Sequence, residues 1–132
     1  HAMREPIRTA GLTPDDIDYI NAHGTSTPLN DRLETLAIKQ VFGERAYKIP
    51  VSSIKSQIGH STIAASSIEA VACLMMLKRQ MVSPTINYEV PDPECDLDYV
   101  PNKSRAVKLT HILSNSFGFG GQNTCAVFSK GR

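Results

Sequence analysis

The sequence has 132 residues, 41% hydrophobic and 20% charged, a balance that favours one ordinary globular domain over a disordered chain. Fourteen scattered basic residues against thirteen acidic ones leave a formal net charge of +1, which argues against a nucleic-acid-binding surface. No apolar run approaches the ~20 residues of a membrane span and no signal-peptide pattern opens the chain, so we expect a cytoplasmic protein without membrane contact.

Strand and helix patterns alternate along the chain. Short apolar runs bounded by turn residues predict strands, and apolar residues at helical spacing predict helices. The first half is predicted to hold a helix tail, a buried strand, a helix capped by Asn30 or Asp31, and a second strand: Ala2–Ala10, Ile17–Ala22, 30–43 and Ile49–Ser53. The second half is predicted to hold a loop, a long helix buried on most sides, a proline-punctuated segment and two closing strands: Lys55–Ser61, Ile63–Gln80, Ser83–Pro101, His111–Ser116 and Thr124–Ser129. This alternation indicates an α/β fold with helices packed on a mixed sheet.

The first of four notable segments is Asn21-Ala22-His23-Gly24-Thr25-Ser26-Thr27-Pro28, directly after a predicted strand. Reactive groups of α/β proteins gather at strand ends. A histidine beside glycine and three hydroxyls can act as a donor or a base close to a ligand. A capped turn with a structural histidine explains the same residues.

The second segment, Ser52–His60, holds Lys55 and His60 before the long helix. A solvated lysine is the ordinary interpretation, but a packed lysine needs carboxylate partners. Glu34 and Glu69 are the candidates, and Glu69 is the more telling because an unpaired carboxylate on an apolar helix is costly to bury.

The third segment, Asn115–Gly121, spaces two phenylalanines with glycines and suggests a mobile gate, or simply a glycine-rich hairpin turn with core phenylalanines. It has no GxGxxG pattern, which excludes a dinucleotide loop. The fourth segment joins Pro84–Asn87 with Cys95–Pro101 and has no evident chemistry of its own.

Together and in this order, the four segments resemble the β-ketoacyl-acyl carrier protein synthases of the elongating type II class, over nearly the whole chain. The resemblance implies that residues 1–132 are the C-terminal half of a thiolase-like fold and that the N-terminal half with the nucleophilic cysteine is absent. It implies decarboxylative Claisen condensation of malonyl-acyl carrier protein with an acyl thioester in fatty-acid elongation. It further implies an acyl carrier protein bearing malonyl- or acyl-phosphopantetheine as partner, a homodimeric parent protein, and no cofactor or metal.

The resemblance also implies roles for individual residues. His23 and His60 would donate to the oxygen that becomes negative as carbon dioxide leaves. Lys55 would hold His60 and pair with Glu34 and Glu69, supported by Asp31. The pantetheine arm and acyl thioester would meet the hydroxyls and the glycine-rich turn, with Phe119 as the gate: Thr25, Thr27, Phe117, Gly118 and Phe119.

The sequence departs from the family pattern in two ways. After His60, Ile63-Ala64-Ala65-Ser66-Ser67 replaces a GAAG-like run of small residues, which adds volume at the expected tunnel. Cys73, Cys95 and Cys125 form no CxxC pair and lack the helix N-terminus or adjacent cation that activates a thiol. The chain alone is therefore expected to be inactive in condensation.

Several alternatives stay open at this point. A non-catalytic partner subunit resembling a chain-length factor, or a polyketide ketosynthase fragment, would share these segments. A metal site on the two histidines lacks HxxxH or HxH spacing, and a serine hydrolase lacks its GxSxG elbow. If the long helix packs on a missing half, the isolated chain should expose an apolar patch.

Overall fold

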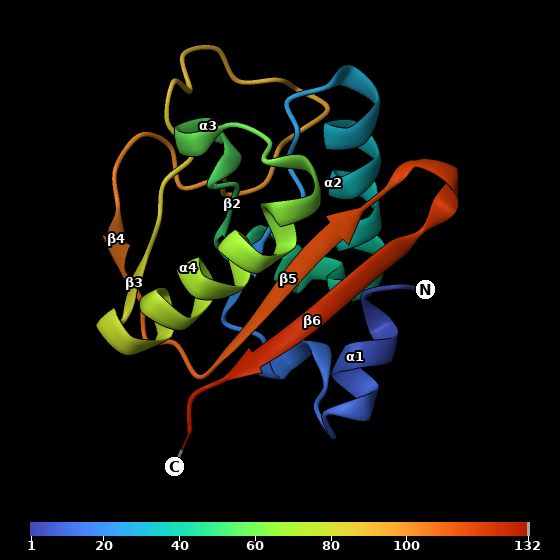
Figure 1. The fold of residues 1–132 in the computed structure, drawn as a ribbon, viewed down its shortest axis with the longest axis vertical. Helices are drawn as coiled ribbons and strands as arrows, with labels where there is room; N and C mark the ends of the chain where they lie inside the picture. The colour runs from blue at the N-terminus through green and yellow to red at the C-terminus, as the bar shows by residue number, and fades with distance from the viewer. Residues whose placement is uncertain (132) are drawn as a thin grey trace.

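The computed structural model describes residues 1–131, and the chain folds around a four-stranded mixed sheet (Figure 1). The strand order is β2-β1-β5-β6, with β1 parallel to both neighbours and β6 antiparallel to β5. The four strands span Tyr19–Asn21 (β1), Val51–Ser52 (β2), His111–Phe117 (β5) and Asn123–Ser129 (β6). The predicted α/β class with a mixed sheet is confirmed.

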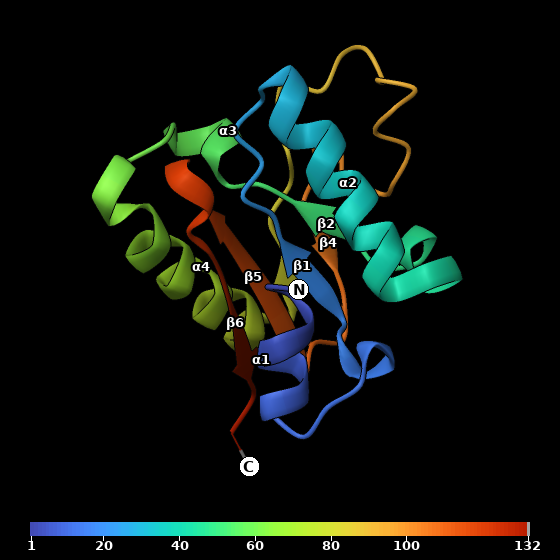
Figure 2. The ribbon, with the colours of Figure 1, turned by 90° about the vertical axis from the view of Figure 1, so that its right-hand side faces the viewer.

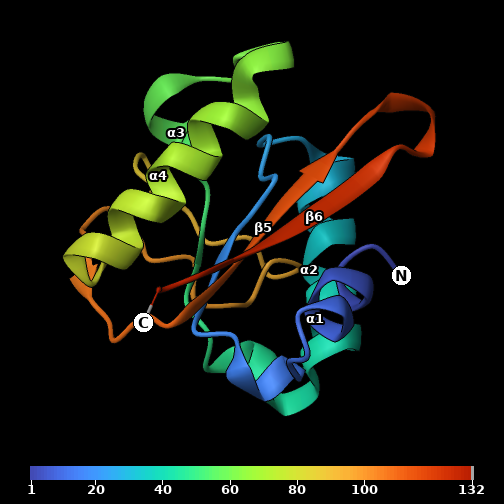
Figure 3. The same ribbon diagram turned by 60° about the horizontal axis from the view of Figure 1, so that its bottom comes forward.

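Helices cover both faces of this sheet, with α1 and α2 on one side and α4 on the other (Figures 2 and 3). The helices span Arg4–Thr9 (α1), Pro28–Phe42 (α2), Lys55–Ile58 (α3) and Ala65–Arg79 (α4). Short 3-10 turns lie at Pro14–Asp16, Gly43–Tyr47, Thr62–Ala64 and Phe119–Gly121. The helices thus form two layers that enclose the strands.

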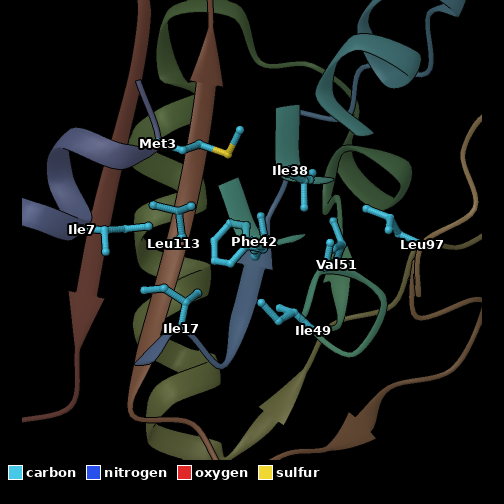
Figure 4. Packing of buried hydrophobic residues seen from close by; sticks show 12 residues of the cluster. Met3, Ile7, Ile17, Ile38, Phe42, Ile49, Val51, Leu97 and Leu113 are labelled. Carbon is cyan, nitrogen blue, oxygen red and sulfur yellow. The ribbon is translucent and has the colours of Figure 1, made fainter. Parts of the chain in front are cut away.

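Two hydrophobic clusters form the core, one on each face of the sheet. Neighbouring residues of a strand point to opposite faces, so Leu113 of β5 packs with Phe42 of α2 (Figure 4), whereas Ile112 packs with Leu77 of α4. Each large aliphatic side chain buried in this way stabilises the fold by about 1.5–3 kcal/mol. Burial on both faces fixes β1 and β5, and with them the loops at their ends.

The start of α2 differs from the prediction. The capping side chain is Thr27, which accepts a hydrogen bond from the backbone N–H of Asn30 at 3.4 Å, and Pro28 opens the helix. Proline is favoured there because its missing N–H would have no intrahelical partner. The prediction that Asn30 or Asp31 caps this helix is therefore wrong.

The segments after β2 contain more regular structure than predicted. Lys55–Ile58 forms one helical turn instead of a loop. A two-stranded antiparallel sheet, β3 (Met81–Val82) with β4 (Arg105–Ala106), flanks the segment predicted to be irregular. Elements of two to four residues are too short to show a hydrophobic period.

One side of α4 is apolar and exposed. Glu69, Cys73 and Met76 are buried against the sheet, while Val71 and Leu74 are exposed on the opposite side. The prediction that this helix is buried on most sides is wrong for this chain, and the expected exposed apolar surface is present. Within residues 1–131, no helix combines the length and the apolarity needed to cross a membrane.

Candidate active site

A single carboxylate fixes the main chain around His23, the second residue after β1. Glu34 of α2 accepts hydrogen bonds from the backbone N–H groups of His23 and Gly24, each at 2.9 Å, and from the side-chain amide of Asn115 on β5 at 2.9 Å. The amide of Asn30 adds a fourth donor at 3.3 Å. Burial raises the pKa of Glu34, and these donors oppose that rise. The carboxylate therefore joins the ends of β1 and β5 to α2.

The glycine after His23 is packed too tightly for any side chain. Gly24 has a φ of +42°, and a Cβ at this position would lie 2.5 Å from Cβ of Ser53. The Ser53 hydroxyl in turn donates to the Gly24 carbonyl at 2.9 Å. This contact brings the His23 loop against the chain that leads into Lys55.

Lys55 and Glu69 form a buried ion pair. Their side chains are 6% and 2% exposed, and the Lys55 ammonium donates to Glu69 Oε1. Burial raises the pKa of Glu69, opposed by Lys55. The predicted pairing of Lys55 with Glu69 is found, but the predicted pairing with Glu34 is wrong, because the Glu34 oxygens are already occupied by the His23 loop and Asn115.

The two histidines from separate loops lie side by side. The ring centroids of His23 and His60 are 5.6 Å apart, with the ring planes at 83°. His60 is exposed, and its Nδ1 accepts the backbone N–H of Thr62 at 3.0 Å. In the neutral ring the proton therefore sits on Nε2, which leaves that nitrogen as a donor. Gly59, with a φ of +74°, makes the turn that precedes His60.

His23 is a neutral ring at physiological pH. Its side chain is nearly buried, and burial, followed by electrostatic interaction with Lys55 and then with His60, lowers its pKa to about 4. A neutral imidazole has one N–H and can donate it to a partly negative oxygen without giving up the proton. The two rings thus lie close together, and the positive charge of Lys55 acts on His23.

The glycine-rich turn divides into two parts. The Phe117 ring lies 5.7 Å from the His23 ring, tilted by 51°. Phe119 is fully exposed at the tip of the β5–β6 hairpin, and the Gly118 N–H donates to the carbonyl of Gln122 at 3.0 Å. Phe117 therefore belongs to the histidine cluster, whereas Phe119 stands free of it.

A cleft of about 790 Å³ opens beside His60 and is lined by Thr25, Thr27 and Asp31. The two threonine hydroxyls lie 3.1 Å apart. Asp31 reaches the network only indirectly, through the Asn30 amide at 3.1 Å. The sequence predicts Asn30 only as a helix cap and not as a partner of Glu34, although an amide four residues before Glu34 on one helix face is a recognisable signal.

None of the three thiols is activated. Burial raises the pKa of both Cys73 and Cys125 to about 12, and burial also raises the pKa of Cys95. A nucleophilic thiol needs the opposite shift.

Residues 1–89 match the family described as beta-ketoacyl synthase, C-terminal domain. The chain belongs to the β-ketoacyl synthase family. This β-ketoacyl synthase chain is 56% identical, over 98% of its length, to 3-oxoacyl-[acyl-carrier-protein] synthase 2 of Synechocystis sp., and covers 31% of that relative. The family predicted from the four segments is confirmed.

Solved structures of ketosynthases share the fold. A type II PKS acyl-carrier protein in complex with its ketosynthase bound to the hexaketide matches with a TM-score of 0.95 and 43% identity, over 98% of this chain and 32% of that one. The ishigamide ketosynthase/chain length factor matches with a TM-score of 0.94 and 36% identity, over 98% and 32% respectively. The β-ketoacyl synthase chain thus spans about a third of the length of the relatives it matches.

Proposed function

We propose that this chain supplies the oxyanion-binding histidines of a β-ketoacyl-acyl carrier protein synthase, which condenses malonyl-acyl carrier protein with an acyl thioester. The observation that carries the proposal is the pair of rings, His23 and His60, 5.6 Å apart beside the buried Lys55–Glu69 ion pair. The 56% identity to a 3-oxoacyl-[acyl-carrier-protein] synthase 2 supports the same reaction. Because all three thiols here have raised pKa values, the acyl-accepting cysteine is assigned to another part of the parent protein.

In the proposed reaction, the bond between the malonyl carboxylate carbon and the α-carbon breaks, and carbon dioxide leaves. The electron pair moves into an enolate whose charge gathers on the thioester oxygen. His23 and His60 each donate an N–H to that oxygen, and no proton is transferred. Preorganised donors of this kind lower a barrier by about 3–4 kcal/mol each. The α-carbon then attacks the acyl thioester carbon, and the cysteine thiolate leaves.

The neighbouring groups have supporting roles in this scheme. Burial, and after it the positive charge of Lys55, disfavours protonation of His23 and keeps it a neutral donor. Glu34 holds the backbone that orients His23. The hydroxyls of Thr25 and Thr27 line the cleft and offer hydrogen bonds to the amides of a pantetheine arm. Gly118 and Phe119 are assigned to the approach of the acyl thioester, with the fully exposed Phe119 as the gate.

The test uses the full-length protein that contains this chain, with decarboxylation of malonyl-acyl carrier protein and acyl transfer to the protein measured separately. His23→Ala and His60→Ala should each slow decarboxylation by about 10²–10³-fold while acyl transfer continues. His111→Ala is the matched control, because His111 lies at the opposite end of β5 and contacts Ser129.

Two results would contradict the proposal. One is unchanged decarboxylation in both histidine variants. The other is a full-length protein that is inert alone and active only when it supports a separate ketosynthase, which would identify a non-catalytic partner subunit.

A further inference from the structure

A hydrogen bond between two serines joins α4 to β5. The hydroxyl of Ser66, in the first turn of α4, lies 3.1 Å from the hydroxyl of Ser116, the residue before the last of β5. Figure 1 shows the start of α4 beside the tip of the β5 arrow. Either oxygen can donate, so the contact needs both hydroxyls.

Each serine is next to a part of the histidine site. Three residues after Ser66, on the same side of α4, Glu69 pairs with Lys55. Beside Ser116 on β5, Asn115 binds Glu34 and Phe117 contacts His23. The serine contact therefore connects α4, which follows the His60 loop, to β5, whose Phe117 packs on His23.

The chain between His60 and α4 makes few other contacts with the rest of the protein. Among the described residues from 61 to 67, Ser66 supplies the one side-chain hydrogen bond to another element. The Ile63 side chain is fully exposed. Thr62 has a φ of +49°, a strained backbone state for a β-branched residue. The position of such a segment therefore depends on the few contacts that it makes.

We propose that Ser66 and Ser116 are positioning residues of the histidine site: their hydrogen bond holds the first turn of α4 against the end of β5 and so keeps Phe117 packed on His23. The catalytic consequence rests on the proposed condensation function, but the packing of Phe117 does not. Small displacements of a reacting group cost rate more than binding, since alignment is lost first.

The first test compares Ser66→Ala, Ser116→Ala and the double variant in the full-length protein. Ser67→Ala is the control, because Ser67 is exposed in the same turn and its hydroxyl makes no hydrogen bond among the described residues. Each single variant should lower kcat for condensation about three- to tenfold with KM within about twofold. The double variant should be no worse than either single one, because all three remove the same contact. Ser66→Thr keeps the hydroxyl and should keep most of the rate.

The second test does not depend on activity. Burial keeps the pKa of His23 low, and the ionisable side chains that act on its ring are Lys55 and His60, with Glu34 bound to its backbone. If Phe117 moves away, water reaches the ring, so Ser66→Ala should raise the His23 titration midpoint by about half a unit or more in NMR of histidine-labelled full-length protein. Ser67→Ala should leave it unchanged.

The outcomes separate the two ideas. A full-length protein without condensation activity in which Ser66→Ala still raises the midpoint refutes the proposed function and supports the positioning role. A midpoint and a kcat that match those of Ser67→Ala, or additive losses in the double variant, overturn the positioning role.

Discussion

The two histidines of the site are held in opposite ways. His23 is 9% exposed, and its loop is bound by a buried carboxylate that also ties down β5. His60 is exposed and held through one local hydrogen bond, from the backbone of Thr62. One donor is thus built into the sheet, whereas the other depends on the backbone conformation of a short exposed segment.

This difference indicates that the His23 loop is the rigid part of the site and the segment that holds His60 the mobile part. Buried groups with several hydrogen bonds open only when the fold opens, whereas exposed local contacts open at low free energy. We expect substitutions around His23 to lower the free energy of unfolding more than substitutions around His60. The following predictions test this comparison, from the largest effect to the smallest.

Gly24→Ala and Gly59→Ala compare the glycine next to each histidine. Both positions have positive φ, but a Cβ at Gly24 meets Ser53 at 2.5 Å, whereas a Cβ at Gly59 meets nothing within 4 Å. Gly59→Ala should cost about 1–2 kcal/mol of backbone strain, and Gly24→Ala at least about 2 kcal/mol more. Urea unfolding measures both, and equal losses would contradict the proposed difference between the two loops.

Glu34→Ala should destabilise the protein by about 2–4 kcal/mol, because it leaves two backbone N–H groups and the Asn115 amide without an acceptor. Glu44→Ala is the matched control, since Glu44 is exposed, and should change the free energy of unfolding by less than about 0.5 kcal/mol. Similar midpoints for the two variants in urea would mean that the Glu34 network contributes little.

Acid should lower the free energy of unfolding through protonation of His23. The folded protein holds the pKa of His23 at about 4, whereas an unfolded chain has a histidine pKa near 6.5. The unfolded state therefore binds the extra proton first, and the stabilisation is complete above about pH 6.5 and lost as the pH falls toward 4. After allowance for solvent screening we expect about 1–2 kcal/mol.

The measurement is the difference in unfolding free energy between the wild-type protein and His23→Asn across this pH range. The difference cancels contributions from Glu34 and Glu69, whose raised pKa values act with the opposite sign. A difference that stays flat from pH 6.5 to 4 would show that His23 is not held neutral.

Phe117→Ala and Phe119→Ala compare the two phenylalanines of the hairpin. Phe117 packs on His23 and should cost about 1 kcal/mol when removed, whereas the fully exposed Phe119 should cost less than about 0.5 kcal/mol. Thermal unfolding measures both. A larger loss for Phe119→Ala would mean that Phe119 packs in solution and does not stand free.

Sequence patterns predicted the long elements well and the short ones poorly. β5 and β6 match their predicted strands to within one residue, because each is seven residues long and the glycine-rich turn between them marks where one ends and the other begins. α2 begins at Pro28 and not at the predicted residue 30, although threonine before proline is a strong helix-start signal. β3 and β4, with two residues each, leave no such pattern.

Within the candidate site, the sequence alone determined which residue types are present and that a lysine needed a buried carboxylate, and Glu69 meets that need. Only the tertiary structure decided that Glu34 serves the His23 loop and not Lys55, and that Ser66 meets Ser116. The physical reason is that spacing along a chain sets the local period of helices and strands. Which polar atoms meet across elements depends on packing and on competition among donors for each acceptor.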